Sequence, residues 1–311
     1  MRKNFVDFIE ARAEADPNFV LITADLGYGM FDNFRVKFPD QFINVGVAEQ
    51  NMIGIATGMA MIGMNPVCYS LGNFPTMRCL EQIRNDAAYH DARITIVSSG
   101  GGFGYGQLGM SHHSTEDIGI MRPIPNTQIF VPATAAEIIA ICDSYFEAPG
   151  VKYIRLEKSG PELTALNDAP LEDGFYRYAE GSDLLLIGSG SIISDCMQAA
   201  ESLRSEGIEA SVISLSHVKS ANPAHRKSLH DLASAHTLAI TVEEHNIIGG
   251  IGSVMAEILA ESDSQTKLRR LGMPDQFTTV VGDQAFLRGK YGLDKDAICA
   301  AAKAYFHPSS E

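Results

Sequence analysis

Length, composition and charge limit what this chain can be. Its 311 residues are 45% apolar and 20% charged, as in ordinary globular proteins. At about 100–200 residues per domain, this length predicts two domains. The formal charge of −14 argues against unassisted binding to nucleic acid or to anionic membranes. The N-terminus lacks the apolar region of a signal peptide, and no apolar run reaches transmembrane length. The five cysteines form no CxxC pair. We therefore expect a cytoplasmic protein with reduced thiols and no metal site of its own.

The first half of the sequence alternates short β-branched runs with longer helical patterns. Strands are predicted at Val20–Ala24, Phe42–Val45, Pro66–Ser70, Ile94–Ser98, Thr127–Val131 and Tyr153–Leu156. Helices are predicted between them at Glu49–Met61, Met77–Tyr89, Ser114–Met121 and Ala135–Glu147. This alternation predicts a mostly parallel sheet with helices on both faces.

The pattern lapses after the sixth strand and then resumes. Residues Glu157–Asp173 are polar, aperiodic and contain proline, as in a linker. Further strands are predicted at Leu184–Gly188, Ala210–Leu215, Thr237–Val242 and Leu268–Leu271, and further helices at Ile193–Ser205, Pro223–Ala233, Gly252–Ala260 and Asp294–Tyr305. The predicted fold class is therefore two α/β domains, at 1–160 and 175–311, joined by a linker at 161–174.

A glycine-rich segment, Gly100–Gly109, contains the pattern GxGxxG at 104–109. A dinucleotide fingerprint would open a helix inside the glycine run and place a ribose-binding acid about 20 residues later. Here the predicted helix begins only after His113. A loop that approaches a ligand closely, or closes over it, is the better interpretation.

Two adjacent histidines, His112 and His113, follow this loop. Ser114 and Asp117 then have the spacing of a capping box, which predicts a helix start. The histidines could be ordinary surface or core residues, but the junction of a loop and a helix in an α/β domain is a common functional location. Adjacent histidines cannot easily share a metal ion, and no third ligand is suggested.

Glu49 follows a predicted strand and opens a predicted helix, in the segment NVGVAEQN. One interpretation is an acid favoured by the macrodipole at a helix N-terminus. The other is a carboxyl that loses water among apolar neighbours and can both accept and donate a proton. Those neighbours are Val45, Val47, Met52 and Ile53. The residues alone leave both interpretations open.

Phe74 and Arg78 lie in the segment YSLGNFPTMR, between a predicted strand and the next predicted helix. They could be a core aromatic and a solvated cation. They could equally form a stacking platform for a flat heterocycle.

Four blocks of the sequence resemble, in their order and spacing, the C-terminal half of transketolases. The blocks are VGVAEQNMIGIATGMAMIG, FPTMRCLEQIRNDAAY, GMSHHSTEDIGIMRPIPN and TVEEHNIIGGIGSVMAEILAE. The resemblance covers nearly the whole chain and is strongest to the separately encoded C-terminal subunits of split transketolases. It implies a pyrimidine-binding domain followed by a transketolase C-terminal domain, in an enzyme that uses thiamine diphosphate to transfer a two-carbon ketol unit from a ketose to an aldehyde.

The resemblance also implies roles for single residues. Glu49 would hydrogen-bond N1′ of the cofactor's aminopyrimidine and favour the tautomer that activates the thiazolium carbon. Phe74 would lie under the pyrimidine, and His112 would contact a substrate oxygen. His113, which stands where the family has glutamine, would also face the substrate. Four further residues are implied to lie at the cofactor: Asp25, Leu26, Tyr69 and Arg78.

A partner chain is implied as well. The family's diphosphate- and metal-binding domain, with its GDG…N signature, has no counterpart here, because the only GD pair, Gly282-Asp283, opens no such motif. The diphosphate and its Mg²⁺ or Ca²⁺ would then be held mainly by an N-terminal transketolase subunit. We expect an α2β2 heterotetramer in which this chain is inactive alone.

Two positions concern the substrate, a sugar or sugar phosphate. Where the family usually has GEDG or GADG, this chain has Gly106-Gln107-Leu108-Gly109, so Leu108 replaces an aspartate that contacts a substrate hydroxyl. An apolar side chain there weakens recognition of an ordinary sugar hydroxyl, and we hypothesise a deoxy, branched or nucleotide-linked sugar. Lys158 stands near a phosphate-binding arginine of the family, although a solvated lysine is an equally good interpretation.

Two other functions remain open on the sequence. One is the β subunit of a 2-oxoacid dehydrogenase, which shares this domain pair but not the SHH and EQIRN blocks. The other is a non-catalytic interaction subunit. The changes at Gln107 and Leu108 are compatible with that function, whereas the retention of Glu49, Phe74 and His112 argues against it.

Overall fold

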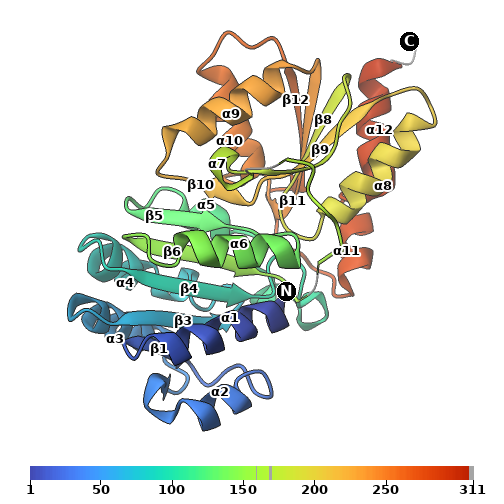
Figure 1. Cartoon of the computed structure of the whole chain (residues 1–311). Helices are drawn as coiled ribbons and strands as arrows, with labels where there is room; N and C mark the ends of the chain where they lie inside the picture. The colour runs from blue at the N-terminus through green and yellow to red at the C-terminus, as the bar shows by residue number, and fades with distance from the viewer. Residues whose placement is uncertain (159, 168–169, 308–311) are drawn as a thin grey trace.

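The computed structural model describes residues 1–158, 160–167 and 170–307. It contains two α/β domains stacked on each other, each built on a sheet with helices packed against it (Figure 1). The predicted fold class is therefore confirmed.

The first sheet has seven strands in the order β10-β5-β6-β4-β3-β1-β2. The strands from the first half are β1 (Phe19–Thr23), β2 (Phe42–Asn44), β3 (Asn65–Leu71), β4 (Ile94–Ser99), β5 (Thr127–Phe130) and β6 (Val151–Leu156). Their pairings are all parallel, as the alternation of strands and helices predicts. The last strand, β10 (His217–Lys219), comes from the second half of the chain and pairs antiparallel with β5. Residues of the second predicted domain therefore contribute a strand to the sheet of the first, which the predicted division by sequence did not include.

The helices of the first domain are α1 (Arg2–Ala15), α2 (Asp32–Lys37), α3 (Glu49–Met61), α4 (Leu80–Gln82), α5 (Asp117–Met121) and α6 (Ala135–Tyr145). The sequence patterns did not predict α1 or α2. The predicted helix Met77–Tyr89 is irregular, with a 3₁₀ turn before α4 and a π-helical segment, Ile83–Ala88, after it.

The predicted helix start at Ser114 is wrong. Ser114 exchanges two backbone hydrogen bonds with Gly102, at 2.9 and 3.0 Å, which hold it in an extended bridge. The helix α5 therefore begins at Asp117, and no side chain caps it. The carboxylate of Asp117 pairs instead with Arg155.

The second sheet has the order β12-β11-β8-β9-β7. Its strands are β7 (Tyr176–Ala179), β8 (Leu184–Gly188), β9 (Ala210–Ser214), β11 (Leu238–Asn246) and β12 (Lys267–Met273), and only β7 pairs antiparallel. The helices are α7 (Pro170–Asp173), α8 (Ile193–Arg204), α9 (Pro223–Ser234), α10 (Ile251–Ala260), α11 (Gln284–Lys290) and α12 (Lys295–Phe306). The patterns did not predict β7 or α11, and α7 lies inside the predicted linker.

Apolar side chains from both domains meet in one buried cluster, which joins Ile129 and Val131 to Ile213 and Leu215. Because this packing crosses the boundary, side chains of the second domain can support loops of the first. None of the described helices is long and apolar enough to cross a lipid bilayer.

Candidate active site

Glu49 is the first residue of α3, at the carboxyl edge of the first sheet. Only 2% of its surface is exposed, and Met52 and Ile53 are buried on the same helix. Val47, one of the predicted apolar neighbours, is 78% exposed and does not enclose the carboxyl. One oxygen, Oε2, accepts a hydrogen bond from Arg78 Nη1 at 2.5 Å. The other has no hydrogen-bond partner in the described part of the chain and can accept one from a ligand.

Phe74 and Arg78 lie on the loop that follows β3. The Arg78 guanidinium lies over the Phe74 ring, 4.6 Å from its centroid, and its side chain is 45% exposed. A planar cation with N–H donors thus stacks on Phe74 and bonds to Glu49. An aminopyrimidine needs the same two contacts, so this observation supports a fit between these residues and the cofactor.

The ring of His112 also lies beside Phe74. The two ring centroids are 5.4 Å apart at an interplanar angle of 66°. His112 Nδ1 lies 3.0 Å from the hydroxyl of Ser111. A hollow of about 230 Å³ opens beside these rings, and its lining includes Phe74, Arg78, Ser111, Glu116 and Phe277. Glu49, Phe74, Arg78 and His112, predicted separately from three segments, therefore form one cluster.

His113 faces the protein interior. It is 1% exposed, its Nε2 lies 3.1 Å from the carbonyl oxygen of Gly106, and its ring packs edge-on against Phe103. Its position stabilises the loop, and its contact with substrate stays a prediction.

Leu108 and Lys158 meet in a second hollow of about 420 Å³, which shares no lining residue with the first. Leu108 is 57% exposed, and the Lys158 ammonium lies 4.0 Å from the centroid of the Tyr105 ring. Burial, and to a lesser extent the charge of Arg2, lowers the pKa of Lys158. Asp283 and Gln284 of the second domain also line this hollow. No sequence pattern indicated that these two residues would lie there.

Three residues implied at the cofactor differ in their surroundings. Asp25 has a positive φ of 58° after β1, and its carboxylate accepts hydrogen bonds from Tyr28 at 2.6 Å and from Asn44 at 3.1 Å. These bonds lower the pKa of Asp25. Leu26, beside it, is half-buried. Tyr69 is 1% exposed and packs against Phe31 inside the domain, and its contact with the cofactor stays a prediction.

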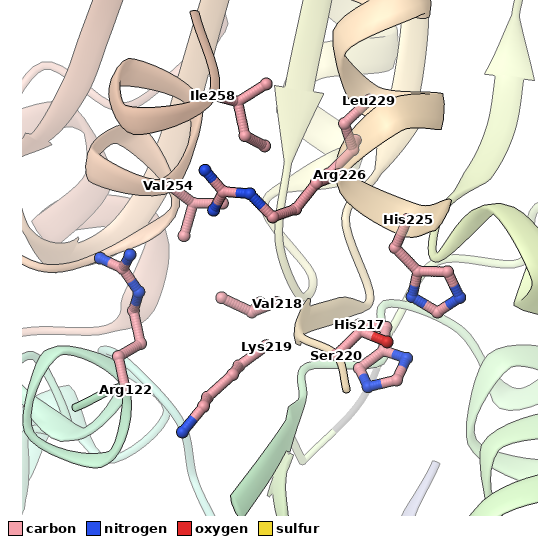
Figure 2. A pocket seen from close by; sticks show the side chains of 10 residues that line it. All are labelled: Arg122, His217, Val218, Lys219, Ser220, His225, Arg226, Leu229, Val254 and Ile258. Carbon is pink, nitrogen blue, oxygen red and sulfur yellow. The ribbon is translucent and has the colours of Figure 1, made fainter. Parts of the chain in front are cut away.

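A third hollow, of about 210 Å³, lies between the domains, away from this cluster (Figure 2). Its lining includes Arg122, His217, Lys219, His225 and Arg226, and no acid of the described part of the chain lines it. Burial and Arg122 lower the pKa of Lys219 to about 8. Lys219 donates hydrogen bonds to Thr127 Oγ1 at 2.9 Å and to the carbonyl of Ile124. It therefore ties the second half of the chain to the first.

No group of three histidine, cysteine, aspartate or glutamate side chains among the described residues could hold a metal ion. The described residues thus bring together a buried acid, an aromatic face and a histidine at the carboxyl edge of a parallel sheet.

Comparison with known proteins identifies the family. Residues 1–161 match the transketolase pyrimidine-binding domain, and residues 176–298 match the transketolase C-terminal domain. The chain belongs to the transketolase family, and it corresponds to the C-terminal subunit of the split enzymes, whose reaction is thiamine diphosphate-dependent ketol transfer. This confirms the resemblance seen in the sequence.

Three similar proteins show how far the likeness extends. The chain is 34% identical to one subunit of the apulose-4-phosphate transketolase of Actinobacillus succinogenes, over 85% of each chain. It is 32% identical to a 6-deoxy-6-sulfo-D-fructose transketolase subunit of Clostridium sp., over 97% of this chain and 93% of that one. A solved split-gene transketolase, described as an inactive β4 tetramer, superposes with a TM-score of 0.86 at 32% identity, over 97% of this chain and 96% of that chain.

Proposed function

We propose that Glu49, Phe74 and His112 form the catalytic half-site that this chain contributes to ketol transfer. The observation that carries the proposal is the burial of Glu49 with one unpaired oxygen, beside the aromatic face of Phe74. Thiamine diphosphate, when bound, supplies the electron sink that carbon–carbon bond cleavage needs. The roles below concern this chain's own side chains.

Glu49 would hydrogen-bond N1′ of the aminopyrimidine and hold the proton that moves between them. Phe74 would support the heterocycle, and Arg78 would lie beside both. Asp25 and Leu26 would border the cofactor from the loop after β1. His112 would donate a hydrogen bond to a substrate oxygen.

An N-terminal transketolase subunit holds the diphosphate and its Mg²⁺ or Ca²⁺ in this proposal. Support comes from the relatives, which are named as subunits, and from the similar β4 tetramer, which is described as inactive. We infer an α2β2 heterotetramer. We also infer a cytoplasmic location, because every cysteine is a buried free thiol.

The substrate proposed is a sugar or sugar phosphate that is deoxy, branched or otherwise modified where standard sugars carry a hydroxyl. Leu108 brings an exposed apolar side chain to the hollow at the sugar site, and Lys158 brings a cation suited to a phosphate or sulfonate. The relatives are named for two non-standard sugars, apulose 4-phosphate and 6-deoxy-6-sulfofructose. That agreement supports a modified substrate without choosing between the two.

Two measurements test this function. Thermal shift with thiamine diphosphate and Mg²⁺ should show saturable binding to the reconstituted pair of subunits, with much weaker binding to this chain alone. Relative kcat/KM over a panel of ketoses should then change in Leu108→Asp toward sugars with an ordinary hydroxyl. Absence of cofactor binding to the pair would remove the catalytic proposal, and an unchanged sugar preference would remove the role of Leu108.

A further inference from the structure

A buried carboxylate of the second domain reaches into the glycine-rich loop of the first. Glu244, on β11, is 2% exposed, and its Oε2 accepts a hydrogen bond from the backbone N–H of Phe103 at 2.8 Å. The preceding residue, Gly102, has a positive φ of 56°, and a methyl group added there would collide with the Glu244 carboxylate. Glycine at position 102 and the acid at position 244 therefore fit each other although they lie far apart in the sequence.

The charge of Glu244 is balanced within the second domain. Arg288, on α11, donates from Nε to Oε1 of Glu244, and it also donates to Asp195 at 2.8 Å and to the Ser191 hydroxyl at 2.7 Å. The side-chain amide of Gln284 donates to both Glu244 oxygens at 2.9 Å. A buried acid with this many donors stays in one position.

A second clamp holds the other end of the same loop. Gly102 and Ser114 form the backbone bridge that closes residues 102–114 into a loop. Arg155 Nη2 donates to the carbonyl of Ser114 at 2.5 Å and to the carbonyl of Glu244 at 2.8 Å. Its Nε pairs with Asp117 at 3.1 Å. Both ends of the loop are thus tied to β11 of the second domain.

This loop carries Leu108 near its middle and His112 near its closed end, the two residues proposed to face the substrate. We propose that Glu244, supported by Arg288, is a positioning residue: it fixes the base of the loop so that these two residues meet the substrate in one geometry. The inference rests on the proposed function for its consequence in catalysis. A small misplacement of a substrate-contacting group lowers rate strongly, whereas the proposed cofactor contacts, on α3 and on the segment that follows β3, lie outside the loop.

The test combines a local and a functional measurement on Glu244→Gln. Gln keeps the shape of Glu244 but loses its charge and one acceptor. In the reconstituted pair, kcat/KM for the ketose donor should fall by about tenfold or more, while the apparent affinity for thiamine diphosphate changes by less than about twofold. In the same assembly, amide hydrogen exchange should speed up across residues 100–109 and stay unchanged in α3. Glu261→Gln, at an exposed acid of the same domain, should change neither quantity.

A second variant covers the possibility that Glu244→Gln fails to fold. Gly102→Ala should give the same two changes, and Gly207→Ala is its matched control, since position 207 also has a positive φ but no neighbour within contact distance of an added methyl group. Unchanged exchange at 100–109 in a folded variant overturns the proposal, and so does a loss of activity matched by an equal loss of cofactor affinity. If the wild-type pair transfers no ketol unit from any sugar, the proposed function fails, and hydrogen exchange still decides whether Glu244 holds the loop.

Discussion

The interface between the two domains, called the seam below, contains the ion pairs Arg155–Asp117 and Arg288–Glu244. Its charged groups are paired differently from those on the face that carries Glu49. In the seam, Arg155 and Asp117 are 1% and 0% exposed and Arg288 and Glu244 are 10% and 2% exposed, and each has its partner within this chain. At the other face, Glu49 is buried but its partner Arg78 is 45% exposed. Both partners of each seam ion pair are therefore shielded from solvent within this chain, whereas the pair at the site is shielded on one side only.

The surface around the site differs in the same direction. Val47, Met77, Met110 and Phe277 are 78%, 46%, 54% and 73% exposed. Exposed apolar side chains gathered near one pocket are typical of a surface that another molecule covers. The difference teaches that stability and catalysis are separated in this chain, and substitutions in the two regions should therefore affect different measurements.

The largest effect is expected at Glu49. Glu49→Gln removes proton exchange with the cofactor and should lower kcat of the reconstituted pair by about 10²–10⁴-fold, the usual range for a lost acid–base group. The unfolding free energy of the isolated chain should change little, because Gln still accepts from Arg78. Glu81→Gln, at an exposed acid of α4, is the control. Full activity in Glu49→Gln would contradict the assigned role.

Breaking the seam should act on stability instead. Arg155→Met leaves Asp117 buried without its cation, which should lower the unfolding free energy by about 3–5 kcal/mol. Arg226→Met removes a surface pair with Glu261, 48% and 71% exposed, and should cost about 0–1 kcal/mol. Urea unfolding of the isolated chain measures both. Equal losses in the two variants would mean that burial does not distinguish the seam from the surface.

The adjacent residues His112 and His113 test the same separation of catalysis from stability. His112→Ala should lower kcat/KM of the pair by about 10²-fold and leave stability unchanged. His113→Ala empties a buried position beside Phe103 and should lower the unfolding free energy by about 1–3 kcal/mol. Activity assays and thermal melts on the two variants separate the roles. A loss of activity in His113→Ala without a loss of stability would support its predicted contact with substrate.

Much of the fold and of the candidate site could be predicted from the sequence, but not all. Most strands of both sheets follow from local patterns, whereas the grouping of residues around Glu49 follows from the resemblance to transketolases. The short strand β10 could not be predicted, because three residues carry too little pattern and its partner β5 lies almost 90 residues earlier. The burial of Tyr69 could not be predicted because β3 is buried along nearly its whole length, so no alternation shows which side chains face inward. The burial of His113 could not be predicted because the fold of the preceding loop decides the direction of its side chain.

The smallest effect is expected from Glu137, an acid of the seam without a cation. Glu137, on α6, is fully buried and accepts hydrogen bonds from Tyr178 of the second domain at 2.5 Å, from the N–H of Ala133 at 2.8 Å and from the Ser214 hydroxyl at 3.1 Å. Burial outweighs these donors and raises its pKa from 4.5 to about 7. The folded state therefore binds more protons than the unfolded state between these values, so this contribution to stability is full below pH 4.5 and is lost as the pH rises through 7.

Glu137→Gln isolates this contribution, which is at most about 3 kcal/mol. Its amide oxygen can keep the bond from Ala133, and its NH₂ can donate to Tyr178, whose hydroxyl can turn toward Thr134 at 3.4 Å. Glu137→Gln should therefore lose less stability than the wild-type chain between pH 5 and pH 8, as measured by urea unfolding across that range. Parallel curves for the two proteins would show that Glu137 stays charged in the seam. The seam would then contain a buried charge without a cation, and it would no longer differ from the site in having an oppositely charged partner for every buried charge.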